Sequence, residues 1–154
     1  MDWKYLYTSL DGRINRKPYW LAIIGFIIVS LLAQFIGLAI GGPILAFLIA
    51  LILVFPGFAL NLKRAHDRNR PAWYVVVPIV LAVVLQIMQF ADPAQAAEPT
   101  GLYLVLMVAM MVYGLVLFID LGFLRGTAGP NQYGPDPLAL QPVAGGPSSV
   151  SPVN

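Results

Sequence analysis

The sequence has 154 residues, of which 59% are hydrophobic and 10% are charged, with a formal net charge of +2. A soluble domain of this length could not bury so much apolar surface, because small domains have a high ratio of surface to volume. This composition excludes a soluble globular protein, a disordered chain and a nucleic-acid-binding protein. The absence of cysteine excludes disulfides, thiolate metal sites and cysteine nucleophiles.

The first residues predict a short amphipathic helix. Trp3, Leu6, Tyr7 and Leu10 recur at helical spacing, which is typical of a helix that lies in the membrane interface. A frayed terminus with a few aromatic residues is the alternative. We do not expect a cleaved signal peptide, because the apolar stretch that follows is longer than the ~7–15 residues of a signal sequence.

Four apolar segments follow. No acidic or basic residue occurs from Pro18 to Leu62, and at about 1.5 Å per residue one helix over this stretch would reach roughly twice the hydrocarbon thickness of a bilayer. We expect a turn at Gly41-Gly42-Pro43, because Gly and Pro oppose a continuous helix. The predicted fold class is an all-α integral membrane protein with four transmembrane helices, at about residues 19–40, 44–62, 71–91 and 102–124.

The basic residues predict the orientation in the membrane. All nine fall on one side of a four-span arrangement: before the first span, between the second and third, and after the fourth. The positive-inside rule assigns this side to the cytoplasm, so both termini are expected there, close to anionic lipid headgroups. Residues 1–138 then form the membrane domain, and the Pro-, Gly- and Ser-rich residues 139–154 predict a disordered tail.

Three polar segments lie on the predicted cytoplasmic side, at residues 10–20, 63–74 and 126–137. We expect them to form one polar plate that caps the cytoplasmic ends of the helices, with Asp67 and Asp136 as partners of the arginines. The candidate residues of the plate are Arg13, Arg16, Arg64, His66, Asp67, Arg68, Arg70, Asn131 and Asp136. A folding and topology clamp that contacts only lipid is the favoured interpretation; a surface for a protein partner, a solute path and a catalytic site are the alternatives.

His66 is the only histidine. With no cysteine and no acidic cluster at ligand spacing, a closed transition-metal site is not expected. The His66-Asp67 pair also has no candidate nucleophile at a recognisable spacing. We therefore expect a hydrogen-bonded loop histidine, no bound cofactor and no enzymatic activity.

Asp120 is the one acidic residue within a predicted span. Acidic residues inside spans are costly and are functional candidates by default. Because Asp120 lies near the predicted cytoplasmic interface, we expect an ion pair with Arg64 or Lys63, and a role in transport or proton movement is the alternative. Gln86 and Gln89 are expected to form interhelical hydrogen bonds.

The three polar segments resemble the motifs of the bacterial inner-membrane family called domain of unknown function 805. That family has a Gly-Arg-x-x-Arg-x-x-[Tyr/Phe]-Trp entry into the first span, an Arg-x-His-Asp-x-x-Arg-x-x-Trp-Trp loop and a final Asn-x-[Phe/Tyr]-Gly-Pro-Asp-Pro element. The matching residues are Gly12, Arg13, Arg16, Tyr19 and Trp20; Arg64, His66, Asp67, Arg70 and Trp73; and Asn131, Tyr133, Gly134, Pro135, Asp136 and Pro137.

Two positions depart from these motifs. Tyr74 replaces the second Trp, and Gln132 stands where an Arg is common, so an ion pair from that position is not expected here. The resemblance covers residues 1–138. It implies a small multispan inner-membrane protein and brings no activity with it.

The sequence therefore predicts a non-enzymatic structural or interaction module of the bacterial inner membrane. Its polar plate would contact anionic lipid headgroups or a protein partner, and a homo-oligomer is compatible with this prediction. The alternative is an oligomeric small transporter or channel component, in which Asp120, Gln86 and Gln89 would face a shared axis.

Overall fold

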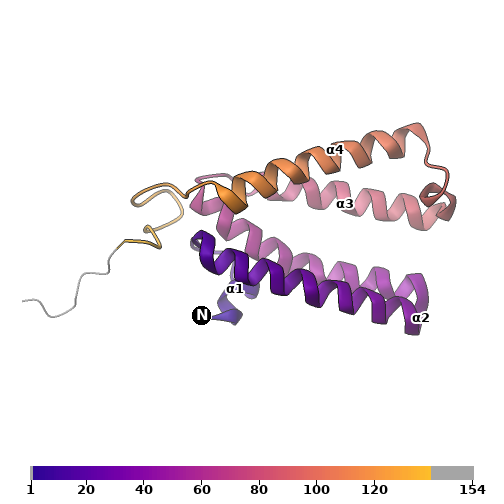
Figure 1. The fold of residues 1–154 in the computed structure, drawn as a ribbon, viewed down its shortest axis with the longest axis horizontal. Coiled ribbons are helices and arrows are strands. Elements are labelled where there is room, and N and C mark those ends of the chain that lie inside the picture. Colours follow the sequence, from indigo (N-terminus) through magenta and orange to yellow (C-terminus); the bar gives the residue numbers. More distant parts are fainter. Residues whose placement is uncertain (1, 140–154) are drawn as a thin grey trace, which may run out of the picture.

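The computed structural model describes residues 2–139, and the regular secondary structure of these residues is helical apart from one isolated bridge between Asn131 and Gly134 (Figure 1). The predicted tail, residues 139–154, lies outside the described residues except for Ala139. The elements in chain order are α1 (Trp3–Thr8), α2 (Arg16–Asp67), α3 (Trp73–Ala91), the 3₁₀ helix η1 (Pro93–Ala96), α4 (Gly101–Leu117) and the π-helix η2 (Phe118–Phe123).

Helix α2 is a hairpin of two arms. Gly42 has φ 64° and ψ −160° inside it, a left-handed conformation that glycine adopts without a Cβ clash. The break falls in the predicted Gly41–Pro43 turn, and Figure 1 shows the second arm returning beside the first. A Cβ on Gly37 would lie 3.4 Å from Ala46 Cα, so small residues allow the two arms to approach closely here.

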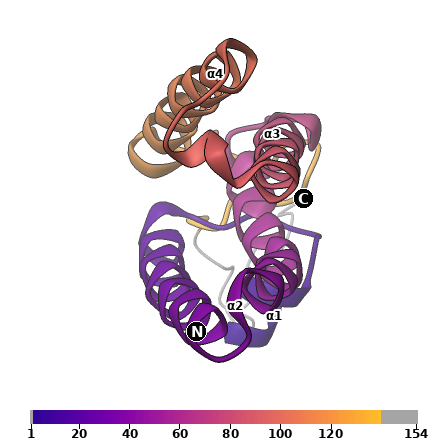
Figure 2. The same cartoon turned by 90° about the vertical axis from the view of Figure 1, so that its right-hand side faces the viewer.

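Thr100 caps the N-terminus of α4, because its hydroxyl oxygen accepts a hydrogen bond from Tyr103 N at 3.4 Å. It ends in the single π-turn η2, which the sequence did not predict. Helix α3 contacts both α2 and α4, whereas α4 reaches α2 mainly through η2. Viewed along the bundle, the two arms of α2, α3 and α4 stand side by side (Figure 2).

Three of the described helices are long and apolar enough to cross a membrane: α2, α3 and the α4–η2 segment. Their apolar side chains point outward. Phe35, Ile40 and Ile52, for example, are each more than 70% exposed. A soluble protein does not expose a surface of this kind, because the burial of apolar area drives its folding.

The packed core lies at one end of the bundle. It consists of Leu6, Ile14, Tyr19, Ala22, Leu60, Ala65, Val75 and Leu121. One expectation for this end was wrong. Leu10 lies beyond α1, which ends at Thr8, and Leu6 is buried in the protein core. Tyr19 is also buried here, and its hydroxyl donates to Asn61 Oδ1 at 2.9 Å.

Candidate functional site

The candidate plate residues gather at the core end of the bundle, where α1, the end of α2, the end of η2 and residues 126–137 meet (Figure 1). Helix α2 continues five residues past the last predicted apolar position, Leu62, so its final turn carries Lys63, Arg64, His66 and Asp67 into this junction. Every one of those four side chains belongs to a buried residue.

Asp67 is the centre of a buried ion cluster. Its Oδ1 accepts hydrogen bonds from Arg13 Nη2 at 3.0 Å and Nε at 3.2 Å. Arg64 Nη1 pairs with Oδ2 on the other side of the carboxylate. The side chains of all three residues are at most 4% exposed. Because water is excluded, these charges are scarcely screened, and losing one of them leaves its partners buried without compensation.

Arg13 also binds the C-terminal segment. Its guanidinium donates to the carbonyl oxygens of Thr127 at 2.7 Å, Gly129 at 2.8 Å and Gly134 at 3.2 Å. One arginine near the N-terminus thus joins the end of α2 to the loop that follows the last helix.

The end of η2 is capped by side chains from α2. The last carbonyl groups of a helix have no partner within it, and here four consecutive ones, from Leu121 to Leu124, each accept a side-chain donor. The donors are Arg64 Nε to Leu121 (2.6 Å), Trp20 Nε1 to Gly122 (2.9 Å), Arg16 Nη1 to Phe123 (3.0 Å) and Arg64 Nη2 to Leu124 (2.5 Å).

Lys63 caps α1 in the same way. Its ammonium group is fully buried and donates to the carbonyl oxygens of Tyr5 at 2.7 Å, Leu6 at 2.8 Å and Ser9 at 2.5 Å. A cation beside the carbonyl end of a helix is electrostatically favoured. Helix α1 is therefore fixed to the bundle by a buried lysine as well as by apolar packing.

His66 is part of the structural contacts. Its ring stacks on Tyr133 with ring centroids 3.8 Å apart, and its Nδ1 lies 3.3 Å from the Gly12 carbonyl oxygen. Asn131 Nδ2 donates to the His66 carbonyl oxygen at 2.9 Å. Within residues 2–139, no group of three or more His, Cys, Asp and Glu side chains is placed to hold a metal ion.

Asp120 has different partners from those expected. It accepts hydrogen bonds from Arg68 Nη2 at 2.8 Å and Arg70 Nε at 3.4 Å, not from Arg64 or Lys63. The reason is that Arg64 and Lys63 are already engaged by Asp67, the end of η2 and the end of α1. The turn after α2 then brings the next two arginines to Asp120.

The expectation for Asp136 was also wrong. Among the described residues its carboxylate makes no ion pair with an arginine; it accepts hydrogen bonds from Leu138 N at 2.8 Å and Gly129 N at 3.0 Å. These two bonds hold the pKa of Asp136 below its ordinary value, because they stabilise the charged form. Asp136 thus closes the loop of residues 129–138 on itself.

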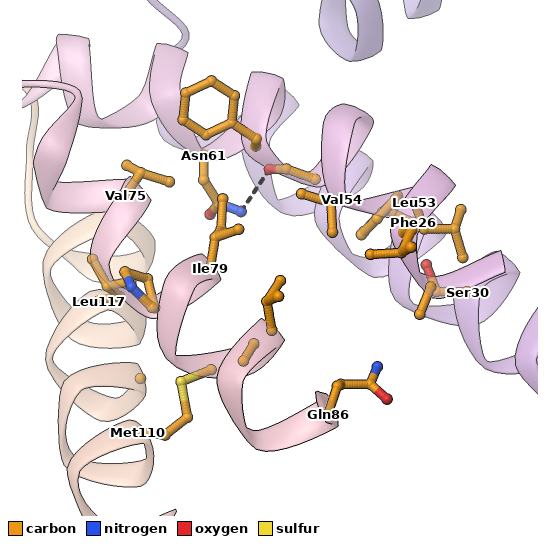
Figure 3. Close-up of a pocket in the computed structure, with 18 of the residues that line it drawn as sticks. Phe26, Ser30, Leu53, Val54, Asn61, Val75, Ile79, Gln86, Met110 and Leu117 are labelled. Atoms are coloured by element: carbon orange, nitrogen blue, oxygen red, sulfur yellow. Dashed lines mark hydrogen bonds between the residues drawn. The ribbon is translucent and has the colours of Figure 1, made fainter. Parts of the chain in front are cut away.

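A cavity of about 520 Å³ lies between the arms of α2, α3 and α4 (Figure 3). Gln86 lines it and Gln89 is exposed on α3; the interhelical hydrogen bonds expected of both do not occur among residues 2–139.

Several contacts at the plate were missed by the sequence reasoning. Lys63 was expected to mark the topology or to pair with Asp120, not to cap α1, and two glycines had no assigned role. A Cβ on Gly126 would lie 2.0 Å from Asp67 Oδ2, and one on Gly122 would lie 2.8 Å from the Trp20 ring. The available signal was the presence of glycine directly after Asp120-Leu121 and Arg125, where close approach of a side chain requires the absence of a Cβ.

The comparisons with known proteins identify the family of the chain. The model of the family described as "Protein of unknown function (DUF805)" matches residues 7–135. Inner membrane protein YhaH of Escherichia coli is 28% identical over 89% of this chain and 97% of its own length. Inner membrane protein YhaI of Escherichia coli is 30% identical over 85% of this chain and 87% of its own.

Uncharacterized protein YiiR of the same organism is 29% identical over 83% of this chain and 85% of its own length. No solved structure matches the chain. The family match covers the first two polar segments and residues 126–135 of the third. The chain therefore belongs to the DUF805 family of bacterial inner-membrane proteins.

Proposed function

We propose that the chain is a non-enzymatic inner-membrane module that crosses the bilayer four times and holds its polar plate against anionic lipid headgroups on the cytoplasmic side. Each arm of α2 would be one span, and α3 and α4–η2 would be the other two. Both termini would then be cytoplasmic. The proposed role is to present a rigid, positively charged surface at the membrane.

The main support for this proposal is that the buried and the exposed charges of the plate have different partners. The buried charged residues are all paired within the protein: Arg13, Lys63, Arg64 and Asp67. A site for general acid–base chemistry needs a titratable group free to meet a substrate, and these groups are held by their partners. This favours a clamp over a catalytic centre.

The exposed basic residues of the plate would form the positively charged surface that faces the lipid headgroups. Arg16, Lys17 and Arg125 are exposed, and the Arg70 side chain is 47% exposed. The plate end of the bundle carries all nine basic residues and five of the acidic ones, while Asp92 and Glu98 lie at the other end. This asymmetry supports a cytoplasmic plate, because basic residues are retained there and anionic headgroups attract them.

Native mass spectrometry from nanodiscs that contain phosphatidylglycerol and phosphatidylethanolamine tests the proposal. We expect wild-type protein to retain phosphatidylglycerol preferentially. Replacing Arg16 or Arg125 by Gln should lower that preference roughly fivefold each, since a basic residue at the surface contributes about 1 kcal/mol. Glu98→Gln, a charge change of the same size at the far end, is the control. Equal retention of both lipids by wild type would contradict a lipid-headgroup surface, and a stoichiometric second protein would point to a protein partner instead.

The alternative, an oligomeric transporter or channel component, requires Asp120 to face a shared axis. The pairing of Asp120 with Arg68 and Arg70 argues against it, because these contacts neutralise the carboxylate at the plate. The two proposals separate in liposomes: an Asp120→Asn change that alters solute flux while the protein remains folded would favour transport, and loss of folding without any flux in wild type would favour the module.

A further inference from the structure

We propose that the cavity between the two arms of α2, α3 and α4 binds an elongated, uncharged, lipid-soluble molecule that carries a hydroxyl or carbonyl group. The cavity is separate from the plate's charged residues, none of which lines it. The proposal therefore goes beyond the headgroup surface, and each can fail without the other.

The shape of the cavity suits a long hydrocarbon. Its lining on the first arm of α2 extends from Tyr19 to Gln34, a separation of 15 residues that corresponds to about 22 Å along a helix. Figure 3 shows Val54 of α2, Ile79 of α3 and Met110 of α4 around the same space. The occupant would thus lie along the bundle axis, in contact with all four helical segments.

The chemistry of the lining excludes a charged ligand. Among the described residues that line the cavity there is no Asp, Glu, Lys, Arg or His, and the walls carry the rings of Phe26, Phe47 and Phe58. An unpaired charge in such surroundings is strongly disfavoured. Water is a poor occupant as well, because cavities with mainly apolar walls stay dry and take up apolar molecules.

Polar groups in this wall favour a ligand that forms hydrogen bonds over a bare hydrocarbon. Gln34 and Gln86 line the cavity, and the Ser30 hydroxyl on the same wall is buried without a partner in the part of the chain that the structure describes. At the plate end, Asn61 is held by the Tyr19 hydroxyl and by the Gly57 carbonyl at 2.8 Å. Polar groups surrounded by hydrocarbon gain from a partner, and a ligand hydroxyl or carbonyl would supply one to a glutamine amide.

The experiment uses two photoactivatable probes of equal chain length, a diazirine-bearing hexadecanol and the corresponding diazirine-bearing hexadecane, with the full chain in nanodiscs. We expect the alcohol to cross-link preferentially to cavity-lining residues such as Phe26 and Met110 of the wild type. Gln86→Leu should lower the preference for the alcohol over the alkane by roughly fivefold, the factor expected for one hydrogen bond within a membrane.

A matched pair of glycine variants tests whether the cavity holds the probe. A Cβ on Gly114 meets no atom within 4 Å, and Gly114 lines the cavity; Gly101, on the same helix, is equally open but does not line it. Gly114→Leu should abolish cross-linking at the cavity, and Gly101→Leu should leave it intact. If Gly114→Leu fails to fold by size-exclusion chromatography, Ala82→Phe provides a second way to fill the same space.

Two results would overturn the proposal. Equal labelling by both probes on outward-facing residues, unchanged in Gly114→Leu, would show ordinary contact with bilayer lipid. Absence of labelling together with cross-links between two copies through cavity residues would show that a second chain fills the space.

Discussion

Replacement of Asp67 by Asn tests the buried ion cluster most severely. The carboxylate is shared by Arg13 and Arg64, and the three side chains are at most 4% exposed. Asn keeps the shape and one acceptor oxygen, but it places an NH₂ group against a guanidinium and leaves two buried cations without an anion. The substitution thus removes the charge with very little change in volume.

The expected loss is large. Breaking a buried ion pair by removing one partner typically costs about 3–5 kcal/mol, because the remaining charge is buried without compensation. With roughly 2–4 °C per kcal/mol for a chain of this size, the midpoint of thermal unfolding should fall by roughly 10 °C. The losses caused by Asp67→Asn and Arg13→Gln should be less than additive in the double variant, because both changes remove the same ion pair.

The assay is thermal unfolding in detergent followed by fluorescence-detected size-exclusion chromatography. Asp136→Asn is the control, since that carboxylate lies on the surface loop and bonds only to backbone amides. A midpoint for Asp67→Asn no lower than that of Asp136→Asn would refute the idea that Asp67 holds the plate together.

Three further changes test separate contacts. Lys63→Met should remove the side-chain donor from the carbonyl end of α1, so the amides of α1 should exchange hydrogen faster by mass spectrometry; unchanged exchange would show that apolar packing alone fixes α1. Gly122→Ala places a Cβ 2.8 Å from the Trp20 ring and should lower the unfolding midpoint more than Gly114→Ala, which meets nothing; equal effects would contradict the close approach. Asp136 has a pKa lowered by two amide hydrogen bonds, so its loop contact should persist above the ordinary carboxyl pKa and be lost only as the pH falls through the lowered one. An amide NMR shift of its partner Gly129 that titrates at or above the ordinary value would contradict this.

The residues of the plate could be predicted because charge is rare in this chain. In a sequence with 10% charged residues, each polar segment between apolar stretches is conspicuous, and the family motifs point to the same positions. The turn at Gly42 was predictable for a related reason, since two glycines and a proline interrupt 45 residues without a charge.

The pairing of those residues could not be predicted. Whether Asp120 meets Arg64 or Arg68 depends on how α2 is rotated against η2, and the sequence carried no sign of the π-turn that ends this helix. The side chains that donate to the carbonyl groups at the helix ends could not be predicted either, because every residue has a backbone carbonyl and the sequence does not show which one accepts a side-chain hydrogen bond. The cavity is a further case, since the aromatic and aliphatic residues that line it look the same in sequence as those that face lipid.

Single-cysteine labelling tests directly whether the plate lies in the cytoplasm. The natural chain has no cysteine. Three exposed alanines offer matched positions: Ala72 and Ala128 beside the plate, and Ala97 at the opposite end of the bundle. In intact cells, a membrane-impermeant maleimide should label only Ala97→Cys from the periplasmic side, and Ala72→Cys and Ala128→Cys should react only after permeabilisation. Labelling of Ala72→Cys or Ala128→Cys in intact cells would contradict the account.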